Sequence, residues 1–105
     1  ASQFAIQALI TVKSPALIYA DSTAAAPLLL VQELHRSSKK NDIKIVSSIG
    51  STEGTPLFNS QTIDDLFSKR NIYVVSNING YYPDFILDGY KLESDGVLYK
   101  VEKRD

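Results

Sequence analysis

The sequence contains no cysteine and a single histidine, His35, among its 105 residues. Without cysteine the chain forms no disulfide bond, offers no thiolate nucleophile and has no sulfur ligand for zinc or an iron–sulfur cluster. One histidine cannot form a histidine cluster, and we interpret His35 as a surface residue at the end of a helix. We therefore expect no metal site.

The sequence also lacks an excess of one charge and a long apolar run. Eleven Lys and Arg residues against twelve Asp and Glu residues leave a formal net charge of -1. The chain therefore has no excess of positive charge that would attract the phosphates of nucleic acid. No apolar run approaches the roughly 20 residues that span a bilayer, and the first residues lack the basic segment and cleavage pattern of a signal peptide. We expect a soluble intracellular protein without a nucleic-acid partner or a membrane span.

The length predicts one domain over residues 1–105. A chain of 105 residues can bury a single hydrophobic core but is short for a complete enzyme with two substrates. The sequence begins at Ala1 without a methionine, which is compatible with a piece of a longer chain.

Three short apolar runs predict buried β-strands. Residues 16–20 are almost wholly apolar, as expected of a parallel strand covered on both faces. The β-branched residues in 43–46 and 72–75 predict two more strands of this kind.

Two patterns with helical spacing lie between these runs. An apolar stripe with a basic last turn predicts a helix over 29–40 that ends before Asn41. Asn59 or Ser60 can cap a second helix over 63–67.

Three further segments are less regular. Residues 3–12 fit either a buried helix or a strand. Residues 84–92 predict a short helix weakened by Gly89, and residues 97–101 predict a closing strand.

Strands that alternate with helices predict βαβ units, whose crossovers are right-handed in nearly all known cases. We therefore expect an α/β fold, a three-layer Rossmann-like domain with a mostly parallel sheet. Ligands of such sheets bind at the carboxyl ends of the strands. Here these ends lead into residues 21–23, 47–55 and 76–82, where we place the candidate site.

The first of these loops offers polar groups to a nucleotide. Asp21 could accept a hydrogen bond from an adenosine ribose hydroxyl, and Ser22 and Thr23 could hold the ribose or a 2′-phosphate. The alternative is a solvated turn in which these residues only cap the following helix. No Arg follows Ala20 directly, which favours NADH over NADPH.

The other two loops differ in character. Residues 47–55, beginning at Ser47, are rich in Ser, Gly and Thr and longer than most connections in compact domains, which is typical of functional loops. Residues 76–82 read SNINGYY: Asn79 and Gly80 predict a tight turn, and the tyrosines either stack on a base or pack at the edge of that turn.

The order of five segments carries a family resemblance. The segments LIYAD, LLLVQEL, DIKIVSS, LFNSQTIDDLF and NIYVVSN follow one another over most of the chain. This order resembles the C-terminal pyridine-nucleotide module of the ferredoxin–NADP reductase and cytochrome b5 reductase superfamily. The resemblance implies an NAD(P)-binding-like domain of a flavin-linked oxidoreductase, which uses NADH or NADPH and passes hydride to FAD held by a β-barrel domain that this chain does not contain.

The sequence departs from two motifs of that family. The glycine-rich turn G-T-G-I-x-P would fall on residues 1–6, where no glycine occurs. The Cys-Gly-Pro motif, whose cysteine lies near the nicotinamide, would fall on Ser76, Asn77 and Ile78. The resemblance thus implies Ser76 as the catalytic position. The predicted cofactor-binding residues are Asp21, Ser22, Thr23, Ser47, Ser76, Asn77 and Gly80.

Besides the nucleotide-binding module, these departures leave a second function open. A chain that has lost both motifs could keep the α/β scaffold without catalysis and bind a protein partner within a larger assembly. If the chain is instead the nucleotide-binding module, its expected partner is a flavin-binding domain.

Overall fold

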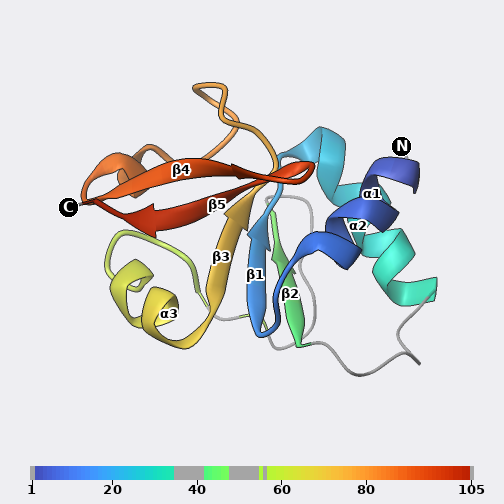
Figure 1. Ribbon diagram of the computed structural model, residues 1–105, viewed down its shortest axis with the longest axis horizontal. Coiled ribbons are helices and arrows are strands. Elements are labelled where there is room, and N and C mark those ends of the chain that lie inside the picture. Colours follow the sequence, from blue (N-terminus) through green and yellow to red (C-terminus); the bar gives the residue numbers. More distant parts are fainter. Residues whose placement is uncertain (1, 35–41, 48–54, 56, 105) are drawn as a thin grey trace.

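The computed structural model describes residues 2–34, 42–47, 55 and 57–104. Within them, five strands form one sheet in the order β2-β1-β3-β5-β4, with helices packed against it (Figure 1). The α/β class predicted from the sequence is therefore confirmed. The elements are α1 (Ser2–Thr11), β1 (Ala16–Tyr19), α2 (Ser22–Leu34), β2 (Ile43–Val46), α3 (Ile63–Lys69), β3 (Asn71–Val74), the 3-10 helix η1 (Asp84–Leu87), β4 (Tyr90–Asp95) and β5 (Leu98–Lys103).

β1, β2 and β3 form the parallel part of the sheet. β1 lies in the middle, with Ile18 opposite Ile45 of β2 and Tyr73 of β3. All three side chains are fully buried, as expected of strands that are covered on both faces. The three apolar runs of the sequence therefore correspond to these three strands.

The other part of the sheet is antiparallel, so the expectation of a mostly parallel sheet holds only for β2, β1 and β3. β5 runs antiparallel to β3, and β4 pairs with β5 in a hairpin that brings Asp95 opposite Leu98. Gly96 occupies the hairpin turn with φ +64, a left-handed conformation that glycine adopts without steric cost. Because a tight turn joins β4 to β5 without a crossover helix, this pair must be antiparallel. The sheet is therefore mixed.

Residues 84–92, predicted as a short helix, form two different elements. The 3-10 helix η1 ends at Leu87, Gly89 has φ +111, and β4 begins at Tyr90. The helix prediction is wrong beyond Gly89 because Tyr90 and Leu92 alternate with polar residues and pair along β5, which is the period of a strand.

α2 begins earlier than its apolar stripe indicates. It starts at Ser22, where the capping interpretation of residues 21–23 places it, whereas the apolar stripe begins at Leu29; its first turns contain three consecutive alanines followed by Pro27. Alanine favours a helix without producing a stripe, and proline normally argues against one, so periodicity does not reveal this start. The predicted basic end, with His35, lies outside the described residues. In the described part of the chain, no helix combines the length and apolar character needed to cross a membrane.

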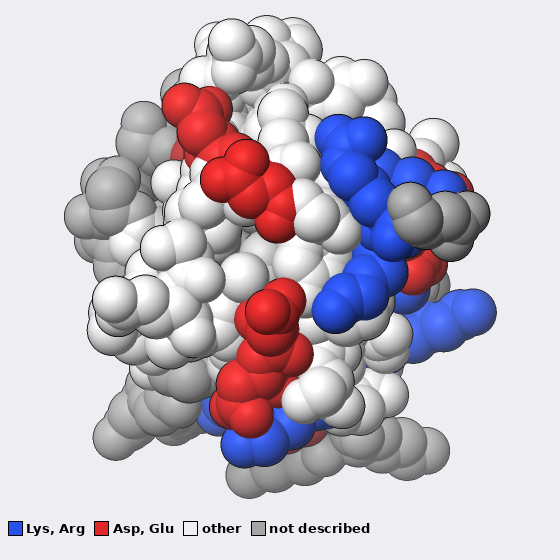
Figure 2. All heavy atoms as spheres, turned by 90° about the vertical axis from the view of Figure 1, so that its left-hand side faces the viewer, with Lys and Arg blue, Asp and Glu red and all other residues white. Residues whose placement is uncertain are grey.

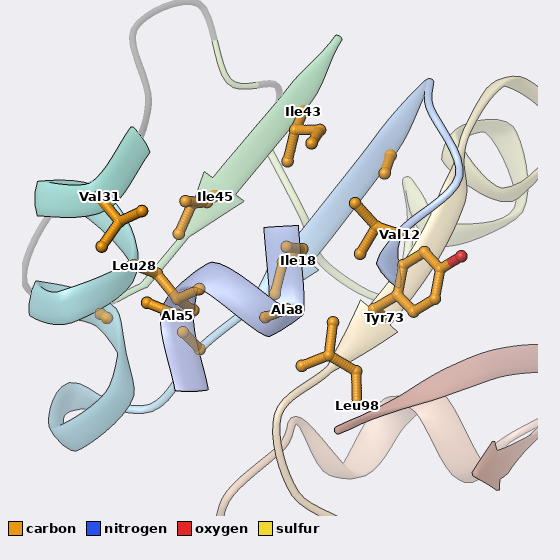
Figure 3. Close-up of a cluster of buried hydrophobic side chains, with 13 residues drawn as sticks. Ala5, Ala8, Val12, Ile18, Leu28, Val31, Ile43, Ile45, Tyr73 and Leu98 are labelled. Atoms are coloured by element: carbon orange, nitrogen blue, oxygen red, sulfur yellow. The ribbon is translucent and has the colours of Figure 1, made fainter. Parts of the chain in front are cut away.

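Two hydrophobic clusters cover the sheet, and neighbouring residues of β1 belong to different clusters because their side chains point to opposite faces. The first cluster contains Ile18 with Ala8 of α1 and Leu28 of α2 (Figure 3). The second contains Leu17 with Ile63 of α3. The first segment of the chain, which fitted either a helix or a strand, is thus helix α1 and contributes small side chains to the first cluster.

β2 is the edge strand next to β1. The N–H of Ala16 donates to the carbonyl of Asp42 at 2.8 Å, so the next carbonyl along the chain, that of Ile43, points away from β1. The side-chain Nε2 of Gln32 donates to this outward carbonyl at 2.7 Å. A side chain of α2 therefore occupies the outer edge of β2 at that position.

Candidate functional site

The three parallel strands end at the same edge of the sheet. The register places Tyr19, the last residue of β1, beside Val46 and Val74, the last residues of β2 and β3. The chain segments that follow these residues are the three loops in which the sequence predicts ligand contacts. We call this side of the molecule the carboxyl edge.

The chain runs from β1 outward to β2 and then back past β1 to β3, so its direction across the sheet reverses within this part of the fold. α2, which links β1 to β2, contributes Leu28 to the first cluster, whereas α3, on the way from β2 to β3, contributes Ile63 to the second. β1 lies between β2 and β3, and the described helices of the two connections, α2 and α3, pack on opposite faces of the sheet. In open α/β sheets, ligands bind in the crevice at such a reversal.

Asp21 lies at the start of α2. Its backbone carbonyl accepts hydrogen bonds from the N–H groups of Ala24 and Ala25, at 3.1 and 2.9 Å, which defines it as the cap residue of the helix. The structure places Ser22 and Thr23 in the first helical turn. The helix therefore begins at the carboxyl edge, as expected if these three residues cap it.

Ser47 follows β2 directly and is partly buried. Residues 48–54 of the predicted functional loop lie outside the described residues. Ser47 is therefore the one predicted ligand-binding residue of this loop that the structure places, and it lies at the carboxyl edge.

The loop after β3 contains two successive turns. The hydroxyl oxygen of Ser76 accepts a hydrogen bond from the N–H of Ile78 at 3.0 Å. The N–H of Tyr81 donates to the carbonyl of Ile78 at 3.0 Å, and Gly80 has φ +96. A positive φ at the third position of a turn requires glycine or asparagine. The tight turn predicted at Asn79 and Gly80 is confirmed.

The two tyrosines after this turn have different environments. Tyr82 is buried in the second cluster, which matches the prediction that the tyrosines pack at the edge of the turn. Tyr81 is 45% exposed, so its ring remains accessible to a flat ligand. Asn77 is exposed in the same loop.

An aromatic group at the carboxyl edge was not predicted from the sequence. The rings of Tyr19 and Phe58 lie 6.1 Å apart, and those of Phe58 and Phe85 lie 5.3 Å apart in an edge-to-face arrangement. The alternation of side chains along β1 could have indicated the position of Tyr19, since Tyr19 shares a face with Leu17. The two phenylalanines come from loop and 3-10 segments without periodicity, so their positions carried no such signal.

At the other end of the parallel strands, where they begin, side-chain hydrogen bonds join distant parts of the chain. We call this side of the molecule the amino edge. The guanidinium of Arg70 binds both carboxylate oxygens of Asp42, at 3.1 and 3.0 Å, and donates to the carbonyl of Ala16 at 3.2 Å. The side-chain Nδ2 of Asn71 donates to the carbonyl of Lys13 at 2.8 Å. These residues join α3, β2 and the segment before β1, and they serve the fold.

Tyr90 links β4 to α3 through a hydrogen bond from its hydroxyl to the carboxylate of Asp64. Burial of the phenol, then the hydrogen bond and the negative charge of Asp64, raise the pKa of Tyr90 to about 12. The ammonium of Lys103 lies 5.4 Å from the centre of the Tyr90 ring, within the range of a cation–π contact. On this side of the molecule, basic side chains form a band that faces two acidic groups across uncharged surface, and at the lower end of the view acidic and basic side chains lie in contact (Figure 2).

The position expected for a glycine-rich turn falls in a helix. Residues 2–6 belong to the first turns of α1, and Ala1 lies outside the described residues. In the parallel part of the sheet, the strand-to-helix turn at the carboxyl edge is Ala20-Asp21, whose Cβ atoms occupy space that a glycine would leave to a phosphate. No group of three or more His, Cys, Asp or Glu residues in the described segments could hold a metal ion.

Comparison of the chain with family models, curated proteins and solved structures finds no match. The order of motifs in the sequence and the geometry of the carboxyl edge are therefore the basis for the function considered below.

Proposed function

We propose that the protein is the nucleotide-binding module of a flavin-linked NAD(P)H oxidoreductase, a three-layer Rossmann-like domain with its ligand at the carboxyl edge. One observation carries this proposal: β1, β2 and β3 end side by side, and α2 and α3 pack on opposite faces of the sheet. The predicted ligand-binding residues belong to the three segments that follow these strands.

The site fits a ribose and a flat ring better than a pyrophosphate. Ala20 is fully buried, and its turn has no glycine through which a phosphate could approach the backbone. The Asp21 carboxylate suits a ribose hydroxyl, and the exposed ring of Tyr81 suits a stacked base. The proposal therefore predicts weak binding, dominated by the nucleoside part of the cofactor.

The residues of this chain would bind and orient the cofactor. The nicotinamide supplies a hydride, and its acceptor is FAD held by a separate flavin-binding domain. Ser76 stands in our predicted catalytic position, where its hydroxyl accepts the Ile78 N–H and keeps its own proton for a donor bond. The absence of an Arg after Ala20 supports NADH over NADPH.

The test is a titration of the isotope-labelled protein with NADH and, separately, NADPH, followed through backbone amide shifts. We expect saturable shifts at residues 21–23, at Ser47 and in 76–82, with NADH bound more tightly. Asp21→Asn should weaken binding, whereas Asp88→Asn, at an exposed position after η1, should not. A folded sample without shifts at millimolar nucleotide would rule out cofactor binding.

A second candidate, the non-catalytic partner-binding scaffold, is supported by an apolar surface on α1 and α2. Ile10 is 70% exposed and Leu30 is 60% exposed, and a shallow groove between the helices is lined by Ile6, Leu9, Ile10 and Val31. α1 contains no charged residue. Apolar side chains that line a surface groove in this way mark interaction surfaces.

This candidate predicts binding of the flavin domain or another protein through α1 and α2 even without nucleotide. In sedimentation or light-scattering measurements with a flavin-loaded β-barrel domain, Ile10→Lys should abolish an association that Leu57→Lys leaves intact, since Leu57 is as exposed but lies outside α1 and α2. Equal effects of both substitutions would argue against this surface.

A further inference from the structure

The loop after β3 contains two asparagines with different neighbours. Asn77 and Asn79 are both exposed, and each begins a short dipeptide, Asn77-Ile78 and Asn79-Gly80. The chemistry available to an asparagine depends on the residue that follows it, because the next backbone nitrogen can attack the side-chain amide carbon. This loop therefore contains a reactive candidate and a matched internal control.

The nitrogen after Asn77 is doubly protected. The N–H of Ile78 donates to the hydroxyl oxygen of Ser76 at 3.0 Å, so this nitrogen is held in a hydrogen bond. The β-branched side chain of Ile78 also restricts the backbone and shields the nitrogen from approach.

The nitrogen after Asn79 has neither protection. Among the described residues, no hydrogen bond uses the N–H of Gly80. Apart from Gly80 and its two neighbours in the chain, no heavy atom of the described residues lies within 4 Å of the point where a Cβ of Gly80 would be. Glycine also gives the backbone the freedom to reach the cyclic geometry.

We propose that Asn79-Gly80 is a site of spontaneous deamidation in the folded protein. The deprotonated backbone nitrogen of Gly80 attacks Cγ of Asn79, the Cγ–Nδ2 bond breaks and ammonia leaves, which forms a five-membered cyclic imide. Water then opens the imide. Attack at Cγ gives aspartate, and attack at the former main-chain carbonyl carbon gives isoaspartate, in which the chain continues through the side chain. One water is consumed, one ammonia is released and no electron is transferred.

The modification adds a negative charge at the carboxyl edge, between Ser76 and Tyr81. The isoaspartate product also inserts a methylene group into the backbone of a turn in which Gly80 has φ +96. Deamidation therefore alters a predicted ligand loop, although the chemistry does not depend on the proposed nucleotide function.

The test is incubation of the folded protein at mildly alkaline pH, followed by digestion and mass spectrometry with fragmentation that distinguishes isoaspartate. We expect the mass increase of an amide converted to an acid at Asn79, with Asn77 unmodified in the same peptide. Asn79→Gln should remove the product, since glutamine would need a larger ring, and Ile78→Gly combined with Ser76→Ala, which removes both protections, should create a second product at Asn77.

Two outcomes would overturn the proposal. The first is an unmodified Asn79 in the folded protein, whether or not the urea-unfolded chain reacts. The second is equal modification of Asn77 and Asn79, because the difference between Ile78 and Gly80 would then have no effect.

Discussion

The two edges of the parallel sheet are held together in different ways. At the amino edge, Arg70 and Asn71 make side-chain hydrogen bonds to Asp42, Ala16 and Lys13, which are far away in the sequence. At the carboxyl edge, the described bonds of the loop after β3 are local turns. The comparison teaches that side-chain hydrogen bonds between distant segments hold the amino edge, whereas the loop after β3 is held by turns of its own.

The largest expected effect breaks the amino edge. Arg70→Ala removes a bidentate ion pair and a hydrogen bond to the carbonyl of Ala16, in a position where the Arg70 side chain is 16% exposed. We expect the free energy of unfolding to fall by roughly 2 kcal/mol, which is less than for a fully buried pair because Asp42 is half exposed. Urea unfolding measures it. Lys69→Ala is the control, because its ion pair with Asp65 is exposed, and an equal loss there would refute the special role of Arg70.

The next effect concerns the hydrogen bond from Tyr90 to Asp64, which lies at neither edge, and it depends on pH. The pKa of Tyr90 is raised to about 12, above that of an unfolded tyrosine, so the folded state favours the protonated phenol. Its contribution to stability is present in full below pH ~10 and is lost as pH rises through the folded pKa, by roughly 2 kcal/mol in total.

Unfolding curves between neutral and strongly alkaline pH measure this contribution. Tyr90→Phe should flatten the alkaline decline, whereas Tyr81→Phe, at an exposed position, should leave it unchanged. A wild-type decline that persists in Tyr90→Phe would assign it to other groups.

A smaller effect sharpens the comparison within the amino edge. Asn71→Ala removes the hydrogen bond to the carbonyl of Lys13, which should cost about 1 kcal/mol. Thermal unfolding measures this loss. Asn77→Ala, at the carboxyl edge, serves as the matched substitution and should change the midpoint little. A larger loss from Asn77→Ala would reverse the proposed contrast.

The smallest effect on stability, and a distinct effect on binding, is expected for Ser76. Ser76→Ala removes an acceptor from the local turn and should change the unfolding free energy by about 0.5 kcal/mol or less. If the nucleotide proposal holds, the same substitution weakens NADH binding in the amide-shift titration. Unchanged binding would remove Ser76 from the site.

The sequence was informative where the pattern is local. β1, β2 and β3 were predictable because each is a short apolar run, and the Asn79-Gly80 turn was predictable because glycine is needed at a positive φ. The loops at the carboxyl edge followed from the βαβ order alone.

Other features depend on contacts that no local pattern encodes. The bond between Arg70 and Asp42 joins residues 28 positions apart. β4 could not be separated from a helix until its pairing with β5 was known, and the alanines before Pro27 hid the start of α2. The role of Ser76 and its neighbours remains a prediction, because chemical function depends on a ligand rather than on the fold.

The hydrogen bond from Gln32 to the outward carbonyl of Ile43 has a consequence for the behaviour of the protein in concentrated solution. An open strand edge is a template on which a strand of another molecule can add, and such additions start aggregates. By occupying one acceptor of that template, Gln32 makes β2 a poorer starting point for intermolecular sheets. The side chain thus helps to keep neighbouring copies of the protein apart.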